Sequence, residues 1–133
     1  MQVNGLDHIN IVAADVDRTV RFFETVLGLQ AKPVPTMPTA FKGRWIYDRH
    51  HHPIVHVQPH DPQRHGVLDD GERATTGAID HVALRCEDFD GMVRRCMELG
   101  LPYKILEHKS IGLRQIFVTD PNNILFELNF SGD

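Results

Sequence analysis

The chain has 133 residues, 41% hydrophobic and 24% charged, and its net charge is −4 with the histidines neutral. This length predicts one compact domain or two very small modules that share a core. The acidic balance, without a basic stripe or interleaved aromatic residues, argues against a nucleic-acid partner. The N-terminal sequence MQVNGLDHINIVAADVD lacks the basic and apolar segments of a secretion signal, and no apolar run is long enough to span a bilayer. We therefore expect a cytoplasmic protein without a membrane partner.

The first predicted strand and helix lie in GLDHINIVAADVDRTVRFFETVLGL, which starts at Gly5. Leu-Asp-His opens a strand-like alternation, and Asp15 is placed to cap the helix that follows. Apolar residues at helical spacing fill one face of that helix. The helix is expected to end at Gly28, because a glycine readily takes the left-handed turn that stops a helix.

The next predicted elements are a strand in Gly43–Tyr47 and a histidine-rich stretch, RHHHPIVHVQPH. The histidines at 50–52 are interpreted as a solvated loop that leads into a short strand, Ile54–Gln58. Strand alternation places the two valines of that strand on one face and His56 on the other. If the valines pack on the core, His56 faces away from it.

The second half of the chain repeats the first. The segment AIDHVALRCEDFDGMVRRCMELGL, starting at Ala78, resembles the segment from Gly5, with Asp88 in the capping position and Gly100 at the helix end. Gly112–Phe117 then parallels Gly43–Tyr47, and ILFELNF parallels IVHVQ. We therefore predict a single 1–133 domain of the α+β class, built from two tandem βαβββ modules at 4–60 and 78–131, with a linker at 61–77.

Cysteine use is compatible with this organisation. The chain has two cysteines, Cys86 on a predicted strand and Cys96 on a predicted helix. Two are too few for a disulfide scaffold and lack the spacing of a zinc knuckle. Both are predicted to be reduced thiols of the core.

The alignment of the two copies singles out four potential metal ligands. His8 pairs with His81, and His56 pairs with Glu127, so each module offers two ligands on its first and last strands. Three imidazoles and one carboxylate suit a single divalent ion of the Fe, Mn, Ni, Co or Zn type, whereas Ca²⁺ and Mg²⁺ prefer oxygen ligands. Four ligands leave two open positions of an octahedral ion, which suits a substrate that chelates through neighbouring oxygens.

The chain resembles the vicinal oxygen chelate superfamily of glyoxalases, fosfomycin-resistance and bleomycin-resistance proteins and extradiol dioxygenases. The resemblance rests on LDHINIVAADVDRTVRFFETVLG, GAIDHVAL and FVTDPNNILFELNF, the last being similar to the family's Asp-Pro-X-Gly-X-X-X-Glu ending with Asn123 in place of Gly. It implies paired βαβββ modules that form a cupped mixed β-sheet, usually in a homodimer, around one divalent metal ion. It also implies that His8, His81 and Glu127 are ligands, and that His56 matches a fourth position that is not a ligand in every branch.

The resemblance also suggests roles around the metal. Glu127 would be the catalytic base if a proton is removed next to a carbonyl. Five residues are candidates for the substrate pocket: Asn10, Trp45, Tyr47, Gln115 and Phe117. Asn10 and Gln115 could instead satisfy backbone groups, and Trp45 and Tyr47 could instead lie in a dimer interface.

We therefore expect a metal-dependent lyase or isomerase of the glyoxalase type, acting on a small molecule with adjacent oxygens. Val12 stands where glyoxalase I carries an Arg that helps to bind glutathione, which argues against a glutathione thioester reaction. A ring-cleaving dioxygenase that uses Fe(II) or Mn(II) is the alternative, and it requires His56 to act as an acid or base beside the metal. A non-catalytic ligand-binding protein of the bleomycin-resistance type is the third hypothesis.

Overall fold

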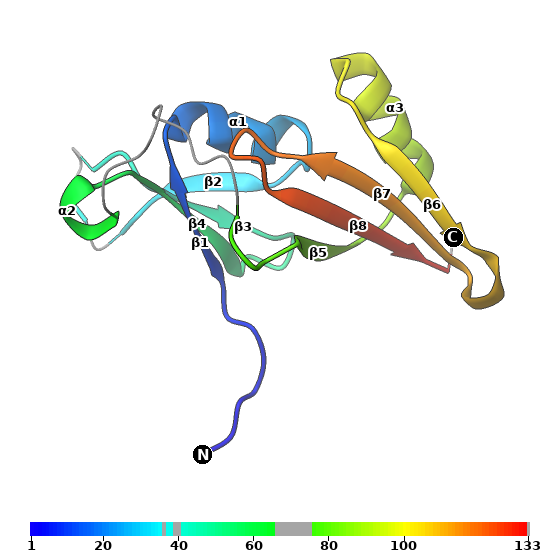
Figure 1. Ribbon diagram of the computed structural model, residues 1–133, viewed down its shortest axis with the longest axis horizontal. Helices are drawn as coiled ribbons and strands as arrows, with labels where there is room; N and C mark the ends of the chain where they lie inside the picture. The colour runs from blue at the N-terminus through cyan, green and yellow to red at the C-terminus, as the bar shows by residue number, and fades with distance from the viewer. Residues whose placement is uncertain (36, 39–40, 66–75, 133) are drawn as a thin grey trace. The chain divides into compact units, whose positions relative to one another are not determined.

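The computed structural model describes residues 1–35, 37–38, 41–65 and 76–132, and the chain divides into two compact units, Met1–Glu72 and Arg73–Asp133. Most of the predicted linker, 66–75, lies outside the described residues, while a short helix, α2 (Pro62–His65), begins within it. Each unit contains one four-stranded sheet and one long helix (Figure 1).

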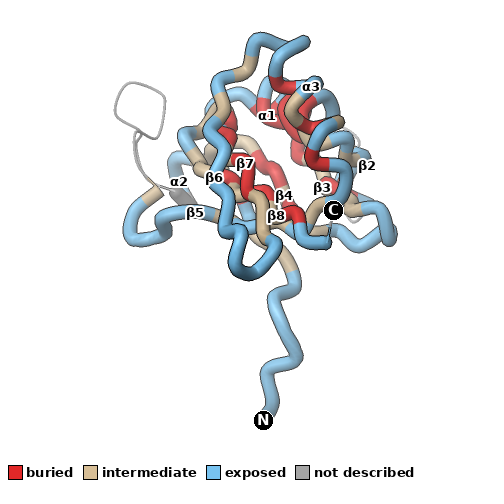
Figure 2. The backbone as a smooth tube through the Cα atoms, turned by 90° about the vertical axis from the view of Figure 1, so that its right-hand side faces the viewer, coloured by how far each residue is buried: buried red, intermediate tan, exposed pale blue. Residues whose placement is uncertain are grey.

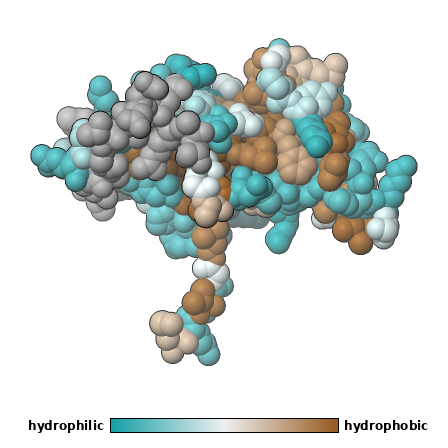
Figure 3. Space-filling model, in the orientation of Figure 1, coloured by the Kyte–Doolittle hydropathy of each residue, from teal (hydrophilic) through white to brown (hydrophobic). Residues whose placement is uncertain are grey.

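The first unit follows the order β1 (Ile9–Ala13), α1 (Val16–Thr25), β2 (Gln30–Pro33), β3 (Arg44–Tyr47) and β4 (Pro53–Pro59). The strands lie in the order β1-β4-β3-β2, and the sheet is mixed because β1 and β4 run parallel while the other pairs are antiparallel. Helix α1 packs on this sheet (Figure 1). The first seven residues form an extended, exposed arm without secondary structure, visible as the narrow extension at the bottom of Figure 3.

Local sequence signals set the bounds of α1. The Asp15 carboxylate accepts a hydrogen bond from the Arg18 amide at 3.0 Å, as the capping prediction required. The helix ends earlier than predicted, at Thr25 with Val26 as its C-cap, and Gly28, with a φ of 67°, lies in the turn that follows. The buried face of the helix meets buried residues of the sheet, and Phe23 is fully buried. Burying one such side chain stabilises the unit by about 1.5–3 kcal/mol.

The second unit has the same order: β5 (His81–Cys86), α3 (Phe89–Leu99), β6 (Lys104–His108), β7 (Leu113–Thr119) and β8 (Leu125–Ser131), with a short 3₁₀ turn at Lys109–Ile111. Its strand order, β5-β8-β7-β6, repeats that of the first unit, and β5 and β8 are again parallel. The expected α+β architecture of two βαβββ modules is therefore confirmed.

Buried and half-buried side chains alternate along β8, the last strand of the second unit. Phe126, Leu128 and Phe130 are buried, whereas the intervening residues are half-buried, and Figure 2 shows the buried stretches of β7, β8 and α3. Phe89 of α3 packs edge-on against Phe130, with ring centroids 5.4 Å apart, and the Arg114 guanidinium lies 4.0 Å from the centre of the Phe89 ring. These contacts fix α3 on its own sheet.

The turn between β7 and β8 is organised by a buried carboxylate. Asp120, which is 5% exposed, accepts hydrogen bonds from the backbone amides of Asn122 and Ile124, both at 2.9 Å. Burial raises the pKa of Asp120, and the hydrogen bonds oppose that shift. Asn123 takes the left-handed conformation predicted for this turn, with a φ of 64°. The turn thereby sets where β8 begins.

The strand registers confirm the predicted pairing of the two copies at the last strand. His56 lies opposite Asn10 on β1 and Trp45 on β3, whereas Glu127 lies opposite Ala83 on β5 and Phe117 on β7. The comparison of β3 with β7 was shifted by two residues, because it matched Tyr47 with Phe117. Trp45 lies opposite His56 and Phe117 lies opposite Glu127, so Trp45 is the equivalent of Phe117.

Within the described residues, no helix is both long enough and apolar enough to cross a lipid bilayer.

Candidate metal centre

In the first unit, the single tryptophan joins two of the candidate histidines. Trp45 stacks on His56 with ring centroids 4.6 Å apart and an interplanar angle of 19°. His8 meets the same indole edge-on at 4.8 Å. Both histidines and Trp45 are half-buried. The structure thus brings His8, Trp45 and His56 into one aromatic cluster, on the opposite face of the sheet from the buried valines of β4.

A chain of amides holds His56 on its other side. Gln58, which is 7% exposed, donates from Nε2 to Asn10 Oδ1 at 2.6 Å. Asn10 Nδ2 lies 3.2 Å from His56 Nδ1. The candidate pocket residue Asn10 therefore contacts a candidate ligand directly. Sequence reasoning did not single out Gln58, although its alternation with His56 along β4 is a signal that it shares that face.

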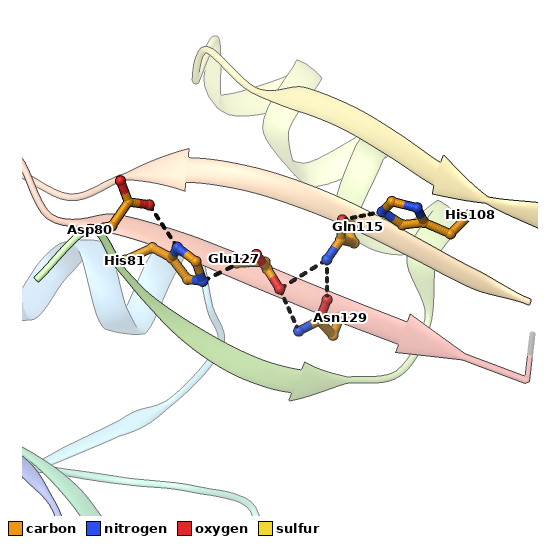
Figure 4. A network of polar contacts seen from close by, with 6 residues as sticks. All are labelled: Asp80, His81, His108, Gln115, Glu127 and Asn129. Carbon is orange, nitrogen blue, oxygen red and sulfur yellow. Dashed lines mark hydrogen bonds and ion pairs between the residues drawn. The ribbon is translucent and has the colours of Figure 1, made fainter. Parts of the chain in front are cut away.

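The second unit contains a network of polar side chains around Glu127 (Figure 4). His81 Nε2 lies 3.3 Å from Glu127 Oε2. The other carboxylate oxygen, Oε1, accepts hydrogen bonds from Gln115 Nε2 and Asn129 Nδ2, both at 2.9 Å. The Glu127 side chain is 15% exposed, so these donors replace much of the water that would solvate its charge.

The network continues away from His81. Gln115 Nε2 also donates to Asn129 Oδ1 at 2.9 Å, and its Oε1 lies 3.1 Å from His108 Nε2 (Figure 4). Gln115 is buried, at 7% exposure, and its amide forms hydrogen bonds with neighbouring side chains. Gln115 therefore orients the Glu127 carboxylate, a role that differs from the pocket contact predicted for it.

An aspartate precedes each of the two first-strand histidines and contacts its ring. His8 Nδ1 lies 2.5 Å from Asp7 Oδ2, and His81 Nδ1 lies 2.8 Å from Asp80 Oδ1. A carboxylate only accepts hydrogen bonds, so Nδ1 of each ring carries a proton, and the lone pair lies on Nε2 when the imidazole is neutral. Histidine metal ligands commonly have this partner on the nitrogen that does not bind the metal. The repeated Asp-His pair was visible in the sequence, but the role of its aspartate was not deduced.

The charge around His81 favours its imidazolium form, in which both ring nitrogens are protonated. The hydrogen bond to Asp80 raises the pKa of His81 above its ordinary value, the charge of Glu127 adds to this, and partial burial opposes it. A metal ion that binds His81 must therefore displace a proton that is held more tightly than usual.

The remaining candidates occupy the same strands. Phe117 is half-buried opposite Glu127, and Tyr47 has the Lys32 ammonium 5.0 Å above its ring. The histidines at 50–52 are exposed, and the Asp48 carboxylate accepts the backbone amides of His50 and His52. These backbone contacts lower the pKa of Asp48. This loop is a hairpin turn held by its aspartate.

The candidate ligands of each unit are of the types that bind a divalent ion, but each unit has too few of them. Each unit places two candidate ligands on its first and last strands. Within the described ranges, no group of three or more His, Cys, Asp or Glu side chains is close enough to hold one ion. Each unit by itself therefore offers two candidate ligands, fewer than the three or four protein ligands of a typical site.

Comparisons with known proteins agree with this architecture. A family model described as the Glyoxalase/Bleomycin resistance protein/Dioxygenase superfamily matches residues 5–128. Glyoxylase I 4 of Arabidopsis thaliana is 21% identical over 134 residues, which cover 96% of this chain and 71% of that protein.

Two solved structures show the same fold. The fosfomycin resistance protein FosX from Mesorhizobium loti is 20% identical, with a TM-score of 0.66 over 99% of this chain and 95% of that one. A mutant of FosX from Listeria monocytogenes, solved with Mn(II) and 1S,2S-dihydroxypropylphosphonic acid, is 18% identical, with a TM-score of 0.68 over 98% and 95% of the two chains. With its two βαβββ modules and a family match over nearly its whole length, the chain belongs to the glyoxalase, bleomycin resistance protein and dioxygenase superfamily.

Proposed function

We propose that the protein is a divalent-metal-dependent enzyme that acts on a small molecule chelated through adjacent oxygens, as a lyase or isomerase of the glyoxalase type. The observation that carries the proposal is the pairing of His81 Nε2 with Glu127 Oε2 at 3.3 Å, with the other nitrogen of His81 held by Asp80. Two potential metal ligands face each other, and each is oriented by further hydrogen bonds.

His8 would add a third ligand from a first module, because Asp7 orients its ring in the same way. The proposal is compatible with two assemblies, in which the two modules of one site belong either to one chain or to the two chains of a homodimer. When bound, the metal would polarise a carbonyl or hydroxyl oxygen of the substrate. The relative solved with Mn(II) and a dihydroxypropylphosphonic acid supports a ligand of this kind, since its hydroxyl oxygens are adjacent.

In this proposal the protein's own residues bind, orient and move protons. Gln115 and Asn129 hold Glu127 through Oε1 and leave Oε2 toward His81. Glu127 is the candidate base for a proton next to a substrate carbonyl, at the atom Oε2. Trp45, Tyr47 and Phe117 are proposed to line the pocket beside it.

A specific observation favours the second candidate, a ring-cleaving dioxygenase. That activity requires His56 beside the metal and not on it, because dioxygen needs a coordination position. The amide of Asn10 contacts His56 Nδ1 and orients its ring, as an acid or base beside the metal would require.

Elemental analysis of untagged, extensively dialysed protein tests the proposal. We expect about one Fe, Mn, Ni, Co or Zn ion per chain. The variant Glu127→Gln should lose the metal while keeping the acceptor oxygen that Gln115 and Asn129 require. The matched control replaces the three exposed histidines at 50–52 and should retain the metal.

Metal that disappears with the loop histidines, or no metal at all, would contradict the proposal and leave a ligand-binding protein on the same scaffold. Activity then separates the two candidates. Turnover of a chelating substrate under strict anaerobiosis with a redox-inert metal supports the lyase or isomerase, and oxygen uptake with catechols supports the dioxygenase.

A further inference from the structure

The three candidate histidines differ in what faces their Nδ1 atoms. At His8 and His81 the neighbour is a carboxylate oxygen, which can only accept a hydrogen bond. At His56 the neighbour is Asn10 Nδ2, which can only donate. A neutral imidazole has one protonated nitrogen and one with a lone pair, so these neighbours select opposite tautomers.

The orientation of the Asn10 amide follows from its second contact. Gln58 Nε2 donates to Asn10 Oδ1 at 2.6 Å, so the oxygen of Asn10 is turned to Gln58 and its NH₂ group to His56. Gln58 itself is buried on β4, two residues beyond His56. The stacked Trp45 ring fixes the plane of the imidazole. Both the ring plane and the Nδ1 partner of His56 are thereby set within the first unit.

The repeat shows that this arrangement accompanies the histidine. In the second unit Glu127 occupies the equivalent position, and its neighbour on the first strand is Ala83, where the first unit has Asn10. The donors to Glu127 come instead from β7 and β8, through Gln115 and Asn129. The module that carries a histidine on its last strand is thus the one whose first strand supplies an amide donor to it.

We propose that Asn10 is a positioning residue that keeps His56 in the Nε2–H tautomer, so that His56 donates a hydrogen bond to the bound substrate and does not serve as a fourth metal ligand. The inference rests on the proposed function for its metal, which His8, His81 and Glu127 would then hold. Three protein ligands leave three positions of an octahedral ion, enough for a chelating substrate and one further ligand. The Nε2–H group suits a negatively charged substrate oxygen.

Nitrogen-15 NMR of histidine-labelled, metal-free protein at alkaline pH tests the tautomer directly. The signals of His56 are assigned by their absence from His56→Gln, and His8, whose Nδ1 faces the Asp7 carboxylate, serves as an internal reference of the opposite type. We expect His56 to show a protonated Nε2 and an unprotonated Nδ1. A protonated Nδ1 on His56 would overturn the proposal, since it means that both amides are reversed.

The variant Asn10→Asp converts the donor into an acceptor of nearly the same shape. An aspartate can still accept a hydrogen bond from Gln58 with one oxygen, and its other oxygen accepts a hydrogen bond from His56 Nδ1–H. We expect the tautomer to invert and Zn²⁺ to bind about 10- to 100-fold more tightly, because the lone pair of His56 Nε2 becomes a fourth ligand. The double variant Asn10→Asp/His56→Gln keeps the added charge without the ligand and should lose the gain.

Two metal results would refute the proposal. One is a loss of Zn²⁺ affinity in His56→Gln as large as that in His8→Gln, since the native His56 would then be a ligand. The other is an Asn10→Asp gain that survives in the double variant, since charge alone would explain it. If the native protein binds no metal, the proposed function fails, while the NMR spectrum of the metal-free protein still decides the role of Asn10.

Discussion

Replacing Gln115 by leucine tests whether this buried amide holds the candidate metal-binding carboxylate. The substitution removes one of the two donors to Glu127 Oε1, a contact of 2.9 Å, in a network whose carboxylate is only 15% exposed. A hydrogen bond to a charged group contributes about 1.5–3 kcal/mol. Because about 1.4 kcal/mol corresponds to a factor of ten, we expect metal affinity to fall about 10- to 100-fold.

The assay is calorimetric titration of substrate-free protein with Zn²⁺ or Mn²⁺. The variant His108→Asn is the matched control, because His108 contacts the far oxygen of the Gln115 amide and not Glu127. It should bind metal like the native protein. Asn129 still donates to Glu127 in Gln115→Leu, so thermal unfolding should show a folded protein.

A metal affinity of Gln115→Leu within about twofold of the native value would refute the reasoning, since that ratio corresponds to far less than one charge-assisted hydrogen bond. If the variant also raises the KM for a substrate, Gln115 contacts the ligand as well. Only the binding constant of the substrate-free protein measures its action on Glu127.

Four further predictions concern the scaffold. Asp120→Ala should lower the free energy of unfolding by about 1–3 kcal/mol for each turn amide left without its acceptor, measured in urea, whereas Asp120→Asn should cost less. Because the folded pKa of Asp120 is raised, native stability should decline as pH rises above 3.8 through that folded pKa, and this decline should be absent in Asp120→Asn. Burial raises the pKa of Cys86 to about 11, and Cys96 is fully buried. A thiol reagent at mildly alkaline pH should therefore label both cysteines slowly in the native protein and rapidly in guanidinium. Fast labelling of the native protein would contradict this burial. Gly91→Ala should destabilise α3, because the added Cβ would meet the capping Asp88 carboxylate; an unchanged unfolding midpoint would show that the cap is dispensable.

Much of the fold was predictable from local signals. The two Asp-capped helices, the glycine end of α3 and the left-handed Asn123 each depend on a few neighbouring residues, and all are present, whereas α1 ends before the predicted Gly28. The alternation along β4 and β8 also held, since Val55 and Val57 are buried while His56 and Glu127 lie on the other face. Such patterns are legible because backbone geometry and burial act over short stretches of chain.

The pairing of β3 was not predictable in the same way. A strand alternation is unchanged by a shift of two residues, so matching Tyr47 with Phe117 satisfied every local pattern. Only the register of β3 against β4 places Trp45 opposite His56.

The sequence by itself determined the repeat, the two-module fold and the residues worth testing, because the spacing of capping, turn and apolar residues repeats between the halves. Which partner each side chain meets was decided only by tertiary structure. Asn10 and His56 are 46 residues apart, and a parallel strand pairing brings them together. Whether a histidine offers a lone pair or a proton depends on one hydrogen bond to such a distant neighbour, and this property has no local signature in the chain.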